Sequence, residues 1–101
     1  MSINHKVTPF YGRRTSIRAV TDEDQAMCTE LYGPYPSLAD ALAATSQKMI
    51  DEALWLSENF SDDSALMDVA DALLEAAPRV LFGTETVDVD LLRFTVYGVT
   101  Q

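Results

Sequence analysis

The longest regular pattern of hydrophobic positions in the chain follows Ser37. Apolar and small side chains recur there at steps of three and four residues, which places them on one face of a helix. Ser37 stands three residues before Asp40, a spacing similar to a capping box, so its hydroxyl is expected to cap the first turn. We therefore predict a helix over about 38–59 whose buried stripe is Leu38, Leu42, Thr45, Met49, Ala53, Leu56 and Phe60.

A second stripe with the same period follows a short break. The polar residues 61–64 offer the break and a new N-cap, and the stripe then consists of Leu66, Val69, Ala70, Leu73 and Ala77. Pro78 is expected to end this helix, because proline lacks a backbone N–H and clashes with the preceding turn. The short connection predicts that the two helices pack as an antiparallel hairpin.

The N-terminal residues favour β structure. Residues 6–11 and 15–20 are rich in β-branched and aromatic types and flank Gly12, which predicts a β-hairpin with its turn at that glycine. Pro9 cannot donate a hydrogen bond, so the first strand is expected at an edge of the sheet.

A short helix is predicted between this hairpin and the long helix. Thr21 resembles an N-cap, and the acids at 22–24 lie where the helix dipole favours negative charge. The helix is expected to run to about Tyr32, where residues 33–36, Gly-Pro-Tyr-Pro, would break it.

The C-terminal part of the chain again favours strands. Residues 80–82 and the alternation of Leu92, Phe94 and Val96 predict two of them. Strands at both ends of a chain, with consecutive helices between them, are typical of the α+β class. We predict a single domain, 1–101, in which an antiparallel sheet of the N-terminal hairpin and the C-terminal strands is covered on one face by the helical hairpin.

Charge narrows the range of partners. The 101 residues include 16 acids and 7 bases, a net charge of −9, and a field of that sign repels nucleic acid and anionic membrane surfaces. We expect no direct binding to either. The charge is uneven, because Asp22 and the residues after it hold all 16 acids and only three bases, whereas Arg13, Arg14 and Arg18 precede them. A basic partner is therefore expected for the acidic part, and the basic hairpin could contact an acidic neighbour in an oligomer.

Composition also suggests a compartment. The first residues hold no apolar run of signal-peptide type, and the apolar segments are too short to cross a bilayer. The single cysteine, Cys28, cannot form an internal disulfide. We expect a cytoplasmic protein.

Catalytic and metal-binding patterns are weak. The one histidine, His5, lies far in sequence from Cys28, and the four glycines stand alone, so neither a nucleophile–base pair nor a phosphate-binding loop is indicated. Helix capping and turn solvation explain the paired acids, which lack a calcium-loop pattern; these are Asp22/Asp24, Asp62/Asp63 and Asp88/Asp90. We predict no catalytic residue, no cofactor and no metal, although a carboxylate-only enzyme stays an alternative.

The remaining feature is an acidic ridge on the second helix. Ser64, Asp68, Asp71 and Glu75 follow helical spacing opposite the apolar stripe, and the predicted helix holds no lysine or arginine. Such a row is either a solvated helix face or a surface for a basic partner. The first helix adds Asp40, Asp51 and Glu58, and Trp55 beside them is expected either in a wide core or at an interface.

Two classes of function follow from these residues. The first is a small acidic protein that inhibits or modulates a basic, nucleic-acid-handling protein through its anionic helix surface, in the style of anti-CRISPR and other phage anti-defence proteins, DNA mimics and nuclease immunity proteins. The alternative is a homo-oligomeric structural or adaptor domain, for example a homodimer, that uses the helical hairpin and Trp55. The candidate partner-binding residues are Asp68, Asp71, Glu75, Asp40, Asp51, Glu58 and Trp55.

Overall fold

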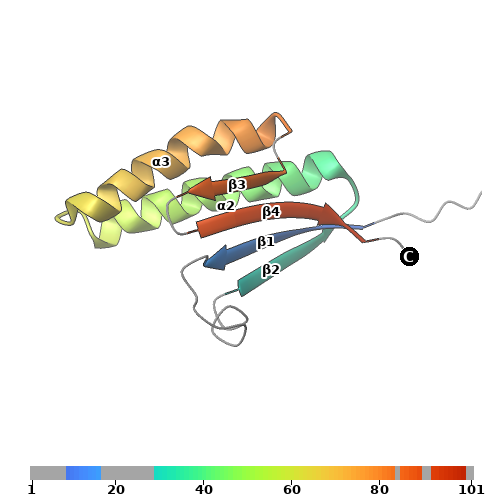
Figure 1. Ribbon diagram of the computed structural model, residues 1–101, viewed down its shortest axis with the longest axis horizontal. Coiled ribbons are helices and arrows are strands. Elements are labelled where there is room, and N and C mark those ends of the chain that lie inside the picture. The colour runs from blue at the N-terminus through green and yellow to red at the C-terminus, as the bar shows by residue number, and fades with distance from the viewer. Residues whose placement is uncertain (1–8, 17–28, 84, 90–91, 100–101) are drawn as a thin grey trace, which may run out of the picture.

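Two layers make up the fold, a four-stranded antiparallel sheet and a pair of helices on one of its faces (Figure 1). The computed structural model describes residues 9–16, 29–83, 85–89 and 92–99. In chain order the elements are β1 (Phe10–Ser16), β2 (Thr29–Tyr35), α2 (Leu38–Asn59), α3 (Ser64–Leu81), β3 (Thr86–Val89) and β4 (Leu92–Gly98). The predicted α+β class, with N-terminal and C-terminal strands in one antiparallel sheet under a helical hairpin, is confirmed.

The first and last described strands are neighbours in the middle of the sheet. The strand order is β2-β1-β4-β3, and Phe10 at the start of β1 lies opposite Gly98 at the end of β4. The pairing continues past both strands, because the Val99 amide donates to the Pro9 carbonyl at 3.0 Å. Pro9 stands just before β1, which is a central strand, so the prediction of an edge strand is wrong. Because Pro9 precedes the strand, its missing N–H removes no hydrogen bond within β1.

The turn predicted at Gly12 is also wrong. Gly12 lies within β1, opposite Tyr32 of β2 and Val96 of β4. A Cβ at this position would collide with the ring of Tyr32. Glycine is present here because an aromatic ring lies over the strand, a known way to compensate a strand glycine.

The short helix predicted after Thr21 is contradicted where it can be checked. Residues 21–28 lie outside the described residues, but 29–32 belong to β2, which pairs with β1 and continues through Gly33 to Tyr35. The expected break at 33–36 is therefore mostly strand. Cross-strand pairing and the burial of Tyr32 against α2 outweigh the local capping pattern, since strand preference depends on such contacts.

Helix α2 has the predicted bounds. The Ser37 side chain accepts a hydrogen bond from the Asp40 amide at 3.1 Å, which confirms the N-cap. The buried face is Ala41, Leu42, Thr45, Ser46, Met49, Ala53 and Leu56. Of the predicted stripe, Leu38 is half-buried and Phe60 is exposed, because both lie at the ends of the helix.

Helix α3 begins where expected but ends later. The Asp63 side chain caps it by accepting from the Leu66 amide at 3.1 Å. Pro78 does not end the helix, and residues 80 and 81, predicted as strand, form its last turn. Val80 continues the buried stripe, so packing offsets the one hydrogen bond that proline removes.

The core lies between the helices and the sheet. Helix α2 crosses β1, β4 and β2, whereas α3 packs on α2 and β3. Ser46 of α2 donates to the Ala77 carbonyl of α3 at 2.9 Å, which joins the two helices through a buried polar contact. Phe94, Met49 and Leu73 are fully buried, and each contributes about 1.5–3 kcal/mol to folding through the hydrophobic effect.

Candidate functional site

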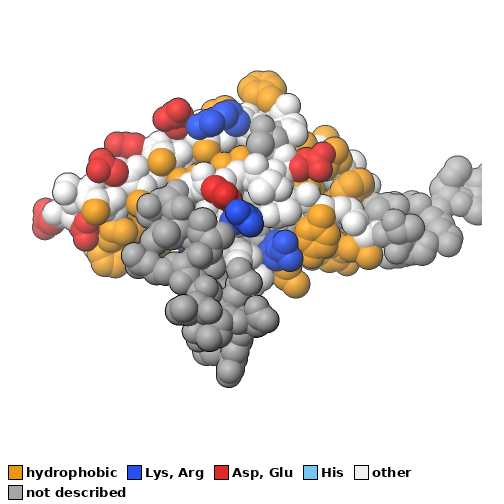
Figure 2. Space-filling view, in the orientation of Figure 1, with side chains coloured by type: hydrophobic (Ala, Val, Ile, Leu, Met, Phe, Trp, Pro, Cys, Tyr) orange, Lys and Arg blue, Asp and Glu red, His pale blue; other side chains and the backbone are white. Residues whose placement is uncertain are grey.

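The acidic ridge of α3 is exposed along its length. Asp68, Asp71 and Glu75 all face solvent, opposite the buried Leu73, and Figure 2 shows acidic side chains along the margin where Figure 1 places α3. Because α3 continues past Pro78, it includes Arg79, which lies 3.5 Å from Glu75. The expectation of a helix without a basic residue is therefore wrong. An exposed pair of this kind contributes little, and Asp68 and Asp71 have no ion pair with a described residue.

Helix α2 carries a second acidic row. At 100° per residue, Asp40, Asp51 and Glu58 fall within about 20° of one line along the helix, on the side opposite the buried Met49, and all three are exposed. Asp51 accepts a hydrogen bond from the Gln47 side chain at 2.9 Å. In the part of the chain that the structure describes, none of the three forms a salt bridge.

The basic residues near α2 are engaged on its sheet side. Lys48 lies 3.1 Å from Glu30 of β2, and Arg14 Nε lies 3.2 Å from Glu52. The second contact is electrostatic, because the Nε–H has no partner with hydrogen-bond geometry. These cations leave the outward acids of the helix without neutralisation. The three arginines of the predicted basic hairpin are thus in different places. Arg14 faces α2, Arg13 lies on the other face of the sheet, and Arg18 is outside the described residues.

Trp55 is half exposed and does not belong to the core. Its ring packs edge-to-face on Phe60, with ring centroids 5.4 Å apart, and Asn59 donates to its carbonyl at 2.9 Å. Leu54, on the other side of the acidic row, is exposed to a similar extent. We call Leu54, Trp55 and Phe60 the Trp55 patch. Because Trp55 is half exposed, the prediction that it belongs to a wide core is wrong. Apolar and acidic side chains alternate on this surface of α2.

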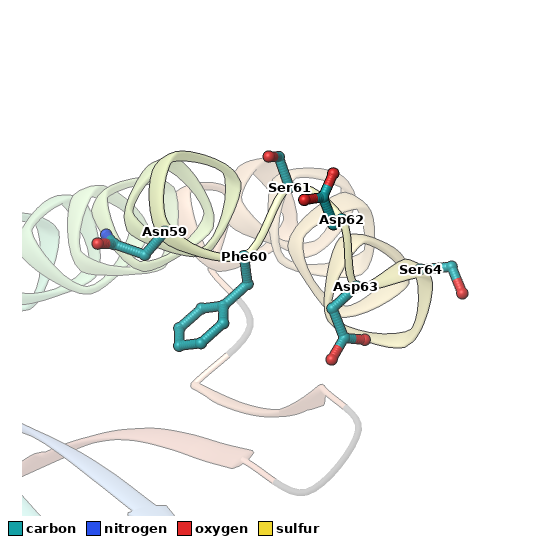
Figure 3. Close-up of a pocket in the computed structure, with 6 residues that line it drawn as sticks. All are labelled: Asn59, Phe60, Ser61, Asp62, Asp63 and Ser64. Atoms are coloured by element: carbon teal, nitrogen blue, oxygen red, sulfur yellow. The ribbon is translucent and has the colours of Figure 1, made fainter.

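The turn between the helices forms an open hollow lined by residues 59–64 (Figure 3). Phe60 and Asp63 extend to one side of this turn, while Ser61 and Asp62 extend to the other. Asp63 is used as the cap of α3, as the sequence predicts for the Asp62/Asp63 pair. Across the described ranges, no group of three or more metal-ligating side chains is found.

The face of the sheet opposite the helices holds a groove that the sequence did not reveal. Tyr11 of β1 and Tyr97 of β4 are stacked with ring centroids 5.9 Å apart, and the guanidinium of Arg13 lies 5.7 Å from the Tyr97 ring. The Tyr11 groove has a volume of about 310 Å³ and is lined by Tyr11, Leu31, Tyr32, Gly33, Tyr97 and Val99. Hydrophobic side chains gather there in Figure 2, where β4 ends. Only the register, which sets Tyr11 opposite Tyr97, brings these residues together.

Three groups on the sheet, Tyr32, Asp88 and Arg93, have shifted pKa values with structural causes, and the hydrogen bonds with Asp88 raise the pKa of the Arg93 guanidinium. Burial raises the pKa of the Tyr32 phenol, although its 2.8 Å hydrogen bond with Thr45 acts in the opposite direction. Hydrogen bonds from Arg93, at 2.7 and 3.0 Å, lower the pKa of the Asp88 carboxyl. Asp88 lies in β3 rather than in the solvated turn that the sequence suggested. These shifts arise from burial and hydrogen bonds within the sheet and against α2.

Comparison of the chain with protein-family models, curated proteins and solved structures finds no significant match. Among the described residues, no helix is both long and apolar enough to cross a membrane. The candidate binding surfaces are therefore the two acidic rows and the Trp55 patch on the helices, and the Tyr11 groove on the sheet.

Proposed function

We propose that this protein is a small acidic inhibitor or modulator that binds a basic, nucleic-acid-handling protein through the outward faces of α2 and α3. The observation that carries the proposal is the separation of charge across the helical layer. The nearby cations Lys48 and Arg14 pair on the sheet side, while two rows of exposed acids face outward. These rows are Asp40, Asp51 and Glu58 on α2, and Asp68, Asp71 and Glu75 on α3.

The charge of the helical hairpin supports this proposal. Residues 37–83 include nine acids and two bases, a net charge of −7, and like charges at helical spacing cost a few tenths of a kcal/mol per pair. The fold gains little from these outward acids: Asp40 lies in the first turn of α2, Asp51 accepts from Gln47, and Glu75 pairs weakly with Arg79. Asp68 and Asp71 have no such contact with a described residue. A partner that must neutralise phosphate offers a basic surface of matching sign, and such complementarity raises the association rate.

The presence of Trp55 next to the α2 row adds a source of affinity. Charged rims mainly set association rate and specificity, whereas aromatic residues often dominate binding energy. A half-exposed tryptophan held against Phe60 is already ordered before binding. We expect Trp55 to contact an apolar spot within the basic surface of the partner.

The proposal is tested with a panel of nucleases and CRISPR effector complexes, measuring binding and inhibition of nucleic-acid cleavage over a salt series. The double variant Asp68→Asn/Asp71→Asn removes two ridge charges, and we expect about tenfold weaker binding at low salt, which corresponds to about 1.4 kcal/mol. Affinity of the unaltered protein should fall as salt rises, because exposed charges are screened.

A matched control changes the same charge on the other layer. Glu85→Gln/Asp88→Asn also removes two acids, both exposed and both in or next to β3 rather than on a helix, and should bind like the unaltered protein. Equal weakening by both double variants would mean that only net charge matters. Binding that responds neither to salt nor to the ridge variant would refute the proposal.

A further inference from the structure

We propose that the Tyr11 groove is a self-association site, which receives the Trp55 patch of a second copy of this chain. The groove and the patch lie on different layers of the molecule, and each carries what the other lacks. The self-association site itself does not depend on the proposed inhibitor function, although it shares Trp55 and the α2 acids with it.

The groove offers an aromatic floor, and beside that floor lies a cation for which the described residues provide no ion-pair partner. Tyr11 and Tyr97 form the floor, and Leu31, which is 61% exposed, forms one wall. Among the described residues, Arg13 contacts the Tyr97 ring but pairs with no carboxylate, unlike Arg93 on the same face, which is bound to Asp88. An occupant with an apolar ring next to a negative charge fits this site, because the ring displaces water from the floor and the charge pairs with Arg13.

The Trp55 patch presents that combination. Trp55 and Leu54 flank the α2 acidic row, and Asp51 and Glu58 lie between them by helical position. The indole of Trp55 is available because it is about half exposed, with one edge held by Phe60. Docking of Trp55 on the tyrosines therefore brings Glu58 or Asp51 toward Arg13, and opposite charges favour this orientation over the reverse one.

The alternative occupant, single-stranded nucleic acid, is less well matched. Aromatic residues on a sheet do stack with bases, but a nucleic-acid groove also needs several cations along the phosphate backbone. On this face, Arg13 is the one described cation without a carboxylate partner, and the whole chain carries −9. Charge complementarity thus favours the acidic patch of a second copy.

The two surfaces lie at opposite ends of the long axis. The groove is at the end of β4, near the start of α2, while Trp55 is near the end of that 22-residue helix (Figure 1). A helix of this length spans about 33 Å, so one molecule cannot fill its own groove. The contact is therefore head to tail, and repeated contacts of this kind give rings or filaments rather than closed two-fold dimers.

The test is sedimentation equilibrium of the full chain over a range of protein and salt concentrations. We expect an average mass that rises with protein concentration and falls with added salt. Arg13→Glu, which alters the groove, and Trp55→Ala, which alters the patch, should each remain monomeric. Phe82→Ala removes an apolar side chain that is 86% exposed but belongs to neither surface, and this control should associate normally.

An equimolar mixture of the two monomeric variants gives the sharpest result. Arg13→Glu retains the patch and Trp55→Ala retains the groove, so the mixture should form a heterodimer that cannot grow further. Circular dichroism of each variant confirms that it is folded. A strictly monomeric parent protein would overturn the proposal, as would association that survives both substitutions or a mixture of folded variants that stays monomeric. None of these results bears on Asp68 and Asp71, so the inhibitor proposal is tested separately.

Discussion

Replacement of Gly12 by alanine should destabilise the protein strongly, although the residue lies in a strand where alanine is ordinarily the better choice. A Cβ on Gly12 would lie 2.5 Å from Tyr32 Oη and closer still to two ring carbons. Comfortable contact needs about 3.5 Å, so the nearest ring carbons must move by about 1.5 Å. That movement breaks the 2.8 Å hydrogen bond between Tyr32 and Thr45, because such bonds extend only to about 3.0 Å.

The magnitude follows from three terms. Overpacking costs about 1–3 kcal/mol, and loss of the hydrogen bond costs about 1 kcal/mol. Alanine returns about 0.5–1 kcal/mol, because it has less conformational freedom than glycine in the unfolded chain. We expect Gly12→Ala to lower the free energy of unfolding by about 2 kcal/mol, which for a domain of this size lowers Tm by about 8–16 °C.

The assay is urea unfolding of Gly12→Ala, Tyr32→Ala and the double variant. If the ring of Tyr32 is the obstacle, alanine at position 12 should cost little once that ring is gone, and the two changes will not be additive. A cost of Gly12→Ala that is the same with and without the Tyr32 ring would refute the steric explanation. Unchanged stability of Gly12→Ala would show that no ring lies close over this position.

Three further predictions concern the helices and the inner face of the sheet. Ser37→Ala removes the cap of α2 and should cost about 1 kcal/mol in urea unfolding. Leu73→Ala, at a fully buried position, should cost about 2–5 kcal/mol, whereas Leu74→Ala on the exposed side should cost under about 1 kcal/mol; similar values for both would contradict the orientation of α3. Because burial raises the pKa of Tyr32 above its ordinary 10.0, its contribution to stability is complete below that pH and declines above it. Tyr32→Phe should therefore lose less stability than the unaltered protein between about pH 9 and 11, and equal slopes would show that this phenol is not responsible.

The helices could be predicted from sequence because their signals are local. The stripe from Leu42 to Leu56 repeats over several turns, and Ser37 supplies a cap at the right distance, so the bounds of α2 agree with the prediction. The end of α3 was missed at Pro78, where a local rule for proline competed with packing. Val80 is fully buried against the core, and that contact belongs to the tertiary structure.

The strands were harder to predict because their partners are distant in sequence. A glycine between two β-rich segments is typical of a turn, and only the Tyr32 ring, twenty residues later, explains Gly12 within a strand. The acidic rows followed from helical spacing and are exposed as predicted. The Tyr11 groove could not be predicted for the same reason as the register of the strands, since Tyr11 and Tyr97 are far apart in the sequence.

The pairing of β1 with β4 in the centre of the sheet has a consequence for biosynthesis. The ribosome makes Phe10 long before Gly98, its partner in the ladder. One edge of β1 therefore stays unpaired while the helices emerge. The helical hairpin can form early because its contacts are local, but the sheet closes only when β4 is available, and distant pairings of this kind are slow. During that interval the exposed edge is a place where chaperones or other nascent chains can add a strand. A stalled nascent chain that lacks β4 should accordingly be far more sensitive to proteases than one that contains it.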